Sequence, residues 1–335
     1  MRLLKKLYLD SKPVSCKSVG DYFCVNGKLL EEQYRDHLSN FHQWDQLSHA
    51  QDWILFPDNI GAFMSLDETA LSQGELYTLL TNKAAKGKKG ALVAIIKGTD
   101  SAKVISLLEK IPLHLRNQVK EVTLDMAASM EKIVKHCFHK AVIVTDRFHV
   151  QKLAYDAVQE MRIMNRWEAI DQENKEIELS KELKKKYIPD ILKNGDTLKQ
   201  LLARSRYLLF KSETHWTPTQ RRRAEILFLK YPSLETAYKL SMKLGQIYHQ
   251  TKEKGIAYTK LAKWYDSVEK CKFKSFNTVA RSIEAHYHTI LNYFDNRSTN
   301  ASAESFNAKI KAFRSSFRGV RNISFFLFRL ANIYA

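Results

Sequence analysis

The segment "GAFMSLDETALSQGELYTLLTNKAAKGKKGALVAIIKG" occupies residues 61–98 and decides the fold. It predicts three successive strands, because apolar runs of strand length are separated by Gly, Ser and Lys. The first strand is expected to start at residue 61 and to end at Asp67. The second is expected over residues 74–82 and the third over residues 90–98, after a lysine-rich turn.

The chain alternates between helix and strand after this segment. Residues 101–112 have the apolar spacing of a helix that stops at Pro112, and residues 119–126 read as a fourth strand. A short helix is expected around residues 130–138. Residues 140–150 begin as a buried strand and turn helical near His149. This order of elements predicts a mixed α/β sheet.

The remaining parts differ in pattern and give four expected regions. Residues 1–60 form a small accessory region with no clear helix-turn-helix or zinc-finger pattern, and residues 61–150 hold the first part of the sheet. Residues 151–295 are almost wholly helical. One helix there starts with the capping box Thr217, Pro218 and Gln220. Residues 296–335 contain the last helices, with Thr299 or Asn300 as the N-cap of the first.

The charge of the chain points to its partners. It has 54 Lys and Arg against 36 Asp and Glu, a net charge of +18, which favours nucleic acid over other partners. The alternative is a basic but otherwise ordinary protein. No long apolar run predicts a membrane span, and the four scattered cysteines suit the reducing cytosol of a cytoplasmic protein.

Three aspartates lie at or just beyond apolar runs: Asp67, Asp125 and Asp146. Carboxylates at the ends of strands cost free energy unless something offsets their charge, and Mg²⁺ prefers such oxygens. The alternative is that each aspartate only caps a turn. Glu304 lies one turn into the final helix. It either completes a metal site or is an acid that the helix dipole favours.

These residues together resemble the DDE transposases of bacterial insertion sequences, specifically the ISL3 type. The segments that carry the resemblance are "SLDETALSQGELYTLLTN", "VTLDMAASM", "VIVTDRFHVQKL" and "STNASAESFNAKIKAFRSSFRGVRNISFFLFRL". The resemblance implies a ribonuclease H-like core that is interrupted by a large helical insertion. It also implies metal-dependent cleavage of DNA at the ends of an insertion sequence, followed by strand transfer into target DNA.

Carried over position by position, the resemblance implies that Asp67, Asp125 and Glu304 are the catalytic acids and hold two Mg²⁺ or Mn²⁺ ions. Asp146 and His149 are expected to support them from a second layer. Glu68 follows Asp67 at once, but the alternation of a strand turns it away, so Asp67 is preferred. The residues expected to bind DNA are Lys83, Lys86, Lys88, Lys89, Asn307, Lys309, Lys311, Arg314, Arg318 and Arg321.

The chain departs from many relatives at its N-terminus, where the cysteine spacing of a zinc site is lacking. The region that reads the element's ends is therefore expected to be absent or encoded as a separate protein. The other expected partners are double-stranded DNA and a second copy of the chain, in the bacterial nucleoid. The alternatives to a transposase are a catalytically silent DNA-binding protein and a ribonuclease H-like structure-specific nuclease.

Overall fold

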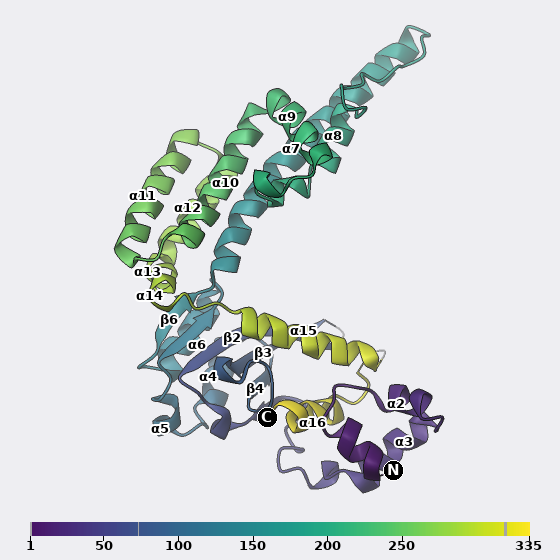
Figure 1. Ribbon diagram of the computed structural model, residues 1–335, viewed down its shortest axis with the longest axis vertical. Helices are drawn as coiled ribbons and strands as arrows, with labels where there is room; N and C mark the ends of the chain where they lie inside the picture. Colours follow the sequence, from purple (N-terminus) through teal and green to yellow (C-terminus); the bar gives the residue numbers. More distant parts are fainter. Residues whose placement is uncertain (1, 73, 318–319) are drawn as a thin grey trace. The chain divides into compact units, whose positions relative to one another are not determined.

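The computed structural model describes residues 2–72, 74–317 and 320–335. The chain divides into two compact units (Figure 1). The first unit is formed by residues up to Asp146 together with Arg297–Ala335, and the second is formed by Arg147–Asn296. The first unit is therefore made from two separate pieces of the sequence.

Within the described residues, the first unit is built on a six-stranded sheet in the order β1-β4-β3-β2-β5-β6. The first four strands of this order pair antiparallel, and β5 and β6 continue the sheet in parallel with β2. This mixed sheet, with the helical unit inserted after β6, is the ribonuclease H-like α/β fold that was expected. The strands are β1 (Trp53–Leu55), β2 (Phe63–Ser72), β3 (Glu75–Asn82), β4 (Leu92–Lys97), β5 (Glu121–Leu124) and β6 (Val142–Thr145).

Strand β2 is longer than the sequence predicted. It does not end at Asp67 but continues to Ser72, which pairs with Glu75 at the start of β3. The two strands form one hairpin, and Gly74 in its turn has a φ of 83°, which glycine adopts without strain. Asp67 is thus held inside a strand rather than at its end. Strand β1, at the edge of the sheet, was not predicted.

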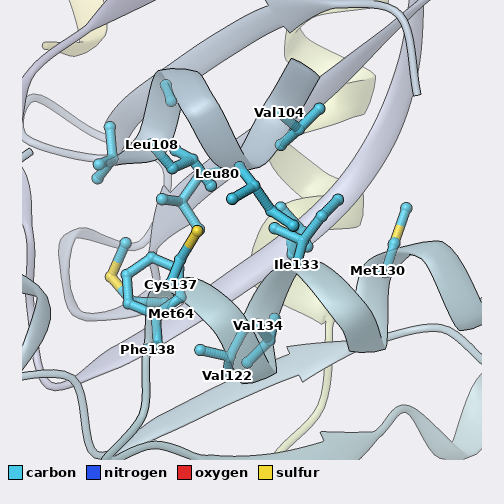
Figure 2. Close-up of a cluster of buried hydrophobic side chains, with 14 of the residues drawn as sticks. Met64, Leu80, Val104, Leu108, Val122, Met130, Ile133, Val134, Cys137 and Phe138 are labelled. Carbon is cyan, nitrogen blue, oxygen red and sulfur yellow. The ribbon is translucent and has the colours of Figure 1, made fainter. Parts of the chain in front are cut away.

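One face of the sheet is covered by α4 (Ser101–Leu108), α5 (Leu113–Arg116) and α6 (Ala128–Cys137). Figure 2 shows the apolar cluster under these helices, to which Met64 contributes from β2 and Val122 from β5. Leu66 belongs to the same cluster. Because side chains alternate along a strand, Ser65 and Asp67 face the opposite side of the sheet.

The opposite face is covered by α15 (Ala301–Ser316) and α16 (Ile323–Tyr334), drawn in yellow in Figure 1. Phe306, Ile310 and Phe313 of α15 pack there against Leu79 and Ile95 of the sheet. Their spacing of three and four residues gives α15 one apolar face. Fully burying side chains of this size stabilises by roughly 1.5–3 kcal/mol each. This packing holds α15 against the sheet.

The N-terminal residues form short helices: α1 (Arg2–Leu4), α2 (Cys16–Tyr22) and α3 (Gly27–Gln33), with single π-helical turns at Lys5–Leu9 and Tyr34–Leu38. They pack on Phe325 and Phe328 of α16. A Cβ atom added to Gly20 of α2 would lie 2.6 Å from the Cα atom of Gly27, so the two helices cross closely. This close helix–turn–helix pair was not predicted.

The second unit is helical, as expected, and starts with α7 (Arg147–Glu182), whose 36 residues span about 54 Å at 1.5 Å per residue. In Figure 1, α10 and α12 pack alongside α7. No helix in the described part of the chain could cross a membrane. The other helices of this unit are α8 (Leu198–Arg204), α9 (Pro218–Lys230), α10 (Pro232–Gln250), α11 (Lys254–Cys271), α12 (Lys274–Ala285), α13 (Tyr287–Leu291) and α14 (Tyr293–Asn296).

Candidate active site

The register of the parallel strands places Asp67 and Asp125 next to each other. β2 pairs with β5 only as far as Ser65 opposite Thr123, while its other edge stays paired with β3. Two residues further along each strand are Asp67 and Asp125. Neighbouring strands are about 4.8 Å apart, so the two aspartates lie at the same level, where β2 and β5 separate.

Asp146 lies at that level on the next strand. The last pair between β5 and β6 is Leu124 opposite Thr145, and the residues one step further are Asp125 and Asp146. The backbone N–H of Asp146 donates to the carbonyl oxygen of Leu124 at 2.9 Å, so the register holds one residue past the strands. Three adjacent strands therefore bring three aspartates to the same end of the sheet, just beyond the last β2–β5 and β5–β6 pairs.

Glu304 reaches the same place from α15. It lies in the first turn of that helix and is exposed, whereas Asp146 is buried. A carboxylate oxygen of Glu304 and one of Asp146 are within 4.8 Å of each other. The apolar side of α15 is packed on the sheet, so the position of Glu304 follows from that packing.

A direct hydrogen bond ties α15 to Asp67. The Nδ2 atom of Asn307, one turn after Glu304, donates to Oδ2 of Asp67 at 2.6 Å. The other carboxylate oxygen of Asp67, Oδ1, accepts the backbone N–H of Glu68 at 2.8 Å. Asn307 is only 8% exposed, and its Oδ1 atom accepts no hydrogen bond from the described residues. An unsatisfied buried group of this kind costs about 1–3 kcal/mol.

A second amide fixes the start of α15. Asn300 precedes the helix, is 1% exposed and accepts a hydrogen bond from the hydroxyl of Ser65 on β2. It occupies the N-cap position, as the sequence allowed, but its side chain makes no capping hydrogen bond. The Asn300 amide instead joins the start of α15 to Ser65 of β2, which lies two residues before Asp67.

The pKa of the neighbouring Glu68 carboxyl is shifted by its surroundings, which include the acids. Burial raises the pKa of the Glu68 carboxyl, and the negative charges of Asp125 and Asp67 raise it further. Leu66 packs on the face away from α15, and alternation turns Glu68 to that same side. This agrees with the preference for Asp67, yet Glu68 remains within electrostatic reach of both aspartates.

Lys83 lies beneath the acids and not on the surface. Its ammonium group donates to Oγ1 of Thr123 at 2.7 Å and lies 3.5 Å from Oε1 of Glu121. Burial lowers the pKa of Lys83, while Glu121 and Asp146 act in the opposite direction. Its side chain is 14% exposed. Lys83 therefore pairs with a buried glutamate inside the unit, and its role in DNA binding stays a prediction.

The other predicted DNA-binding residues fall into two groups. Lys309 donates to the carbonyl oxygen of Gly87 at 2.8 Å, and Arg314 donates to that of Ala70 at 2.9 Å, so both help to attach α15 to the sheet. Arg318 lies outside the described residues. The exposed ones are Lys86, Lys88, Lys89, Lys311 and Arg321.

His149 follows Asp146 by three residues and lies half-buried in the first turn of α7. The sequence analysis named His149 with Asp146. It missed the hydrogen bond of Asn307 to Asp67, and it also missed the Ser65–Asn300 and Lys83–Thr123 bonds beside the acids. The spacing of seven residues between the two asparagines, on one face of a helix that carries Glu304 between them, was the available signal.

Comparison with known proteins gives a consistent picture. The model of a transposase family, the DDE transposases of the ISL3 type, matches residues 64–330. A transposase for the insertion sequence element IS1001 from Bordetella parapertussis is 21% identical over 271 residues. That alignment covers 80% of this chain and 60% of the relative, so the chain matches less than two thirds of the relative's length.

Among solved structures, the Drosophila P element transposase strand transfer complex aligns with 95% of this chain and 90% of the matched chain. The sequence identity is 11% and the TM-score is 0.35.

Proposed function

Because this chain belongs to the ISL3-type family of DDE transposases, we propose that it cuts DNA at the ends of an insertion sequence and joins those ends to target DNA. The observation that carries the proposal is the shared level of Asp67, Asp125 and Asp146 on three adjacent strands, with a carboxylate oxygen of Glu304 within 4.8 Å of one of Asp146. Strand pairing and helix packing alone do not require four carboxylates there.

The residues present fit divalent metal ions. The cluster offers carboxylate oxygens, which Mg²⁺ and Mn²⁺ prefer. Burial, and after it the negative charges of Asp125 and Asp67, raise the pKa of Glu68. Asp67, Asp125 and Glu304 would hold two such ions. When bound, the ions would activate an attacking oxygen and stabilise the leaving oxygen of a phosphodiester.

The chain's own residues orient the acids for this chemistry. Asn307 holds one carboxylate oxygen of Asp67, and the turn after β5 holds Asp125, whose Oδ1 atom accepts the backbone N–H of Ala127 at 2.8 Å. In the proposed reaction water first cuts the strand and leaves a 3′-hydroxyl. That hydroxyl then attacks a target phosphodiester, whose own 3′-oxygen leaves. Asp146 and His149 support the acids in this scheme.

Double-stranded DNA is the proposed partner, at the element's ends and in the target. The net charge of +18 supports it, and the exposed Lys86, Lys88, Lys89, Lys311 and Arg321 can contact phosphates without breaking bonds inside the unit. Two ends must be brought together, so we propose a dimer or larger assembly. A separate protein that reads the ends is part of the proposal.

A strand-transfer assay tests the proposed function. Purified protein is mixed with a labelled element-end duplex, a plasmid target and Mn²⁺, and wild type is compared with Asp125→Asn and Glu304→Gln. Joined product from wild type alone is expected, while all three proteins bind DNA with the same dependence on salt. Cutting without joining would indicate a nuclease. Binding without cutting, even after the end-reading protein is added, would indicate a silent DNA-binding protein.

A further inference from the structure

Two buried amides flank Glu304: Asn300 at the N-cap of α15 and Asn307 within the helix. Asn300 lies four residues before Glu304 and bonds to Ser65, and Asn307 lies three residues after it and bonds to Asp67. Ser65 and Asp67 are on the same face of β2, two residues apart. The helix is therefore fastened to the strand at two points, and Glu304 projects from the turn between them.

The orientation of the Asn307 amide follows from the charge of its partner. An amide oxygen facing an ionised carboxylate would be repelled, so Nδ2 must face Oδ2 of Asp67, as the 2.6 Å contact shows. This leaves the buried Oδ1 atom of Asn307 without a hydrogen bond from the described residues. The Nδ2 atom of Asn300 is unsatisfied in the same way.

An apolar side chain would suit the stability of this position better. The neighbours of Asn307 on α15, Phe306 and Ile310, are part of the apolar cluster between helix and sheet. A residue that costs folding stability and is nevertheless placed there points to a role in function. The only carboxylate that its amide contacts through a short hydrogen bond among the described residues is Asp67.

We propose that Asn307 is a positioning residue that fixes the carboxylate of Asp67 and thereby sets the affinity of the site for divalent metal ions. Asn307 donates to Oδ2 of Asp67 and the N–H of Glu68 donates to Oδ1, so both oxygens are held and the carboxylate group cannot rotate freely. The assignment of Asn307 to DNA phosphates is replaced by this role. The inference rests on the proposed function, in which Asp67 is a metal ligand.

The test is a titration of the whole chain with Mn²⁺, followed by calorimetry or by the electron paramagnetic resonance of free Mn²⁺, together with thermal unfolding. Asn307→Leu has nearly the same size and lacks the donor. It is expected to weaken Mn²⁺ binding by about 10–100-fold, as the loss of an orienting partner typically does. Its melting temperature is expected to equal or exceed that of wild type, which a structural role would not produce.

Phe306→Leu is the matched control, because Phe306 is the adjacent buried residue of α15 and packs in the apolar cluster, with its ring against Tyr334. It should lower the melting temperature and leave Mn²⁺ affinity unchanged. Asn307→Ala, which only removes atoms, should weaken Mn²⁺ binding as Asn307→Leu does. The inference would be overturned if both Asn307 variants bind Mn²⁺ as tightly as wild type while Glu304→Gln binds Mn²⁺ more weakly. If Glu304→Gln and Asp67→Asn also bind Mn²⁺ like wild type, the proposed function itself fails.

Discussion

Burial controls the chemistry of single side chains in the first unit, and Cys16 is the clearest case. It is the first residue of α2, is fully buried, and lies near Arg329 of α16. Burial raises the pKa of the Cys16 thiol to about 11, and Arg329 opposes this only in part. The thiol is therefore neutral and unreactive at neutral pH.

Alkaline solution should destabilise the protein through Cys16. The pKa of its thiol is about 11 in the folded protein and 9.0 when unperturbed, as in an unfolded chain, so the unfolded chain loses the proton first as pH rises. Stability is complete below pH 9 and falls between pH 9 and 11, by at most about 1.4 kcal/mol per pH unit. Urea unfolding at pH 8 and pH 10 should show wild type losing about 1 kcal/mol more than Cys16→Ala. The exposed Cys24→Ser is the control, and it should behave like wild type. Equal losses in wild type and Cys16→Ala would contradict this.

At this scale local patterns in the sequence pointed to the acids but not to their hydrogen-bond partners. Asp125 and Asp146 each follow a short buried strand, which is a local pattern. The contacts of Asp67 with Asn307 and of Lys83 with Thr123 join residues far apart in the chain. They depend on the register of α15 on β2 and on strand order, which local periodicity does not contain.

At the scale of elements, a helix start could be predicted where the sequence contains capping residues. The capping box of α9 was predicted, and the structure confirms it: Thr217 accepts the N–H of Gln220, and Oε1 of Gln220 accepts the N–H of Thr217. Pro218 occupies the first helical position. All three signals are local, so one sequence suffices to read them.

Removing the cap should loosen α9. Thr217→Ala is expected to cost about 1 kcal/mol, because the backbone N–H of Gln220 loses its partner, the Thr217 hydroxyl. Hydrogen exchange of the amides in the first turn of α9 should become faster in this variant. Thr236→Ala, at an exposed position inside α10, is the control and should leave exchange in α9 unchanged. Unchanged exchange in Thr217→Ala would show that packing alone holds the helix start.

Elements without such signals were missed. β1 has three residues, too few for a period to show, and exists because β4 offers it an open edge. In the turn between α2 and α3, Cys24 has a φ of 53°, a conformation that usually selects glycine. Because a cysteine and not a glycine occupies that position, the residue types there did not indicate a turn. The continuation of β2 past Asp67 was missed because the next two residues, Glu68 and Thr69, are polar.

At the scale of the whole molecule, the excess of positive charge belongs to surface side chains that the fold leaves exposed. Lys88 and Lys89, in the turn between β3 and β4, are exposed, whereas Lys83 and Lys309 of the same predicted set are bonded inside the first unit. A net charge read from composition therefore indicates the class of partner but not the residues that touch it.

Neutralising two exposed lysines should weaken DNA binding regardless of sequence. Each phosphate contact that is lost lowers the slope of log K against log salt by about 0.9. Lys88→Gln with Lys89→Gln should reduce the slope by about two, as measured by fluorescence anisotropy over a range of salt concentrations. Lys135→Gln is the control, since this exposed lysine of α6 pairs with Glu131. An unchanged slope in the double variant would place the DNA elsewhere.

The first unit is discontinuous in sequence, and this sets the order in which the protein can mature on the ribosome. Asp67, Asp125 and Asp146 are synthesised before the 150 residues Arg147–Asn296, and Glu304 comes after them. The N-terminal helices also wait for Phe325 and Phe328 to cover their apolar side. A nascent or prematurely terminated chain therefore lacks one acid of the cluster. In such a fragment the apolar side of the N-terminal helices stays uncovered, where chaperones and proteases can bind it.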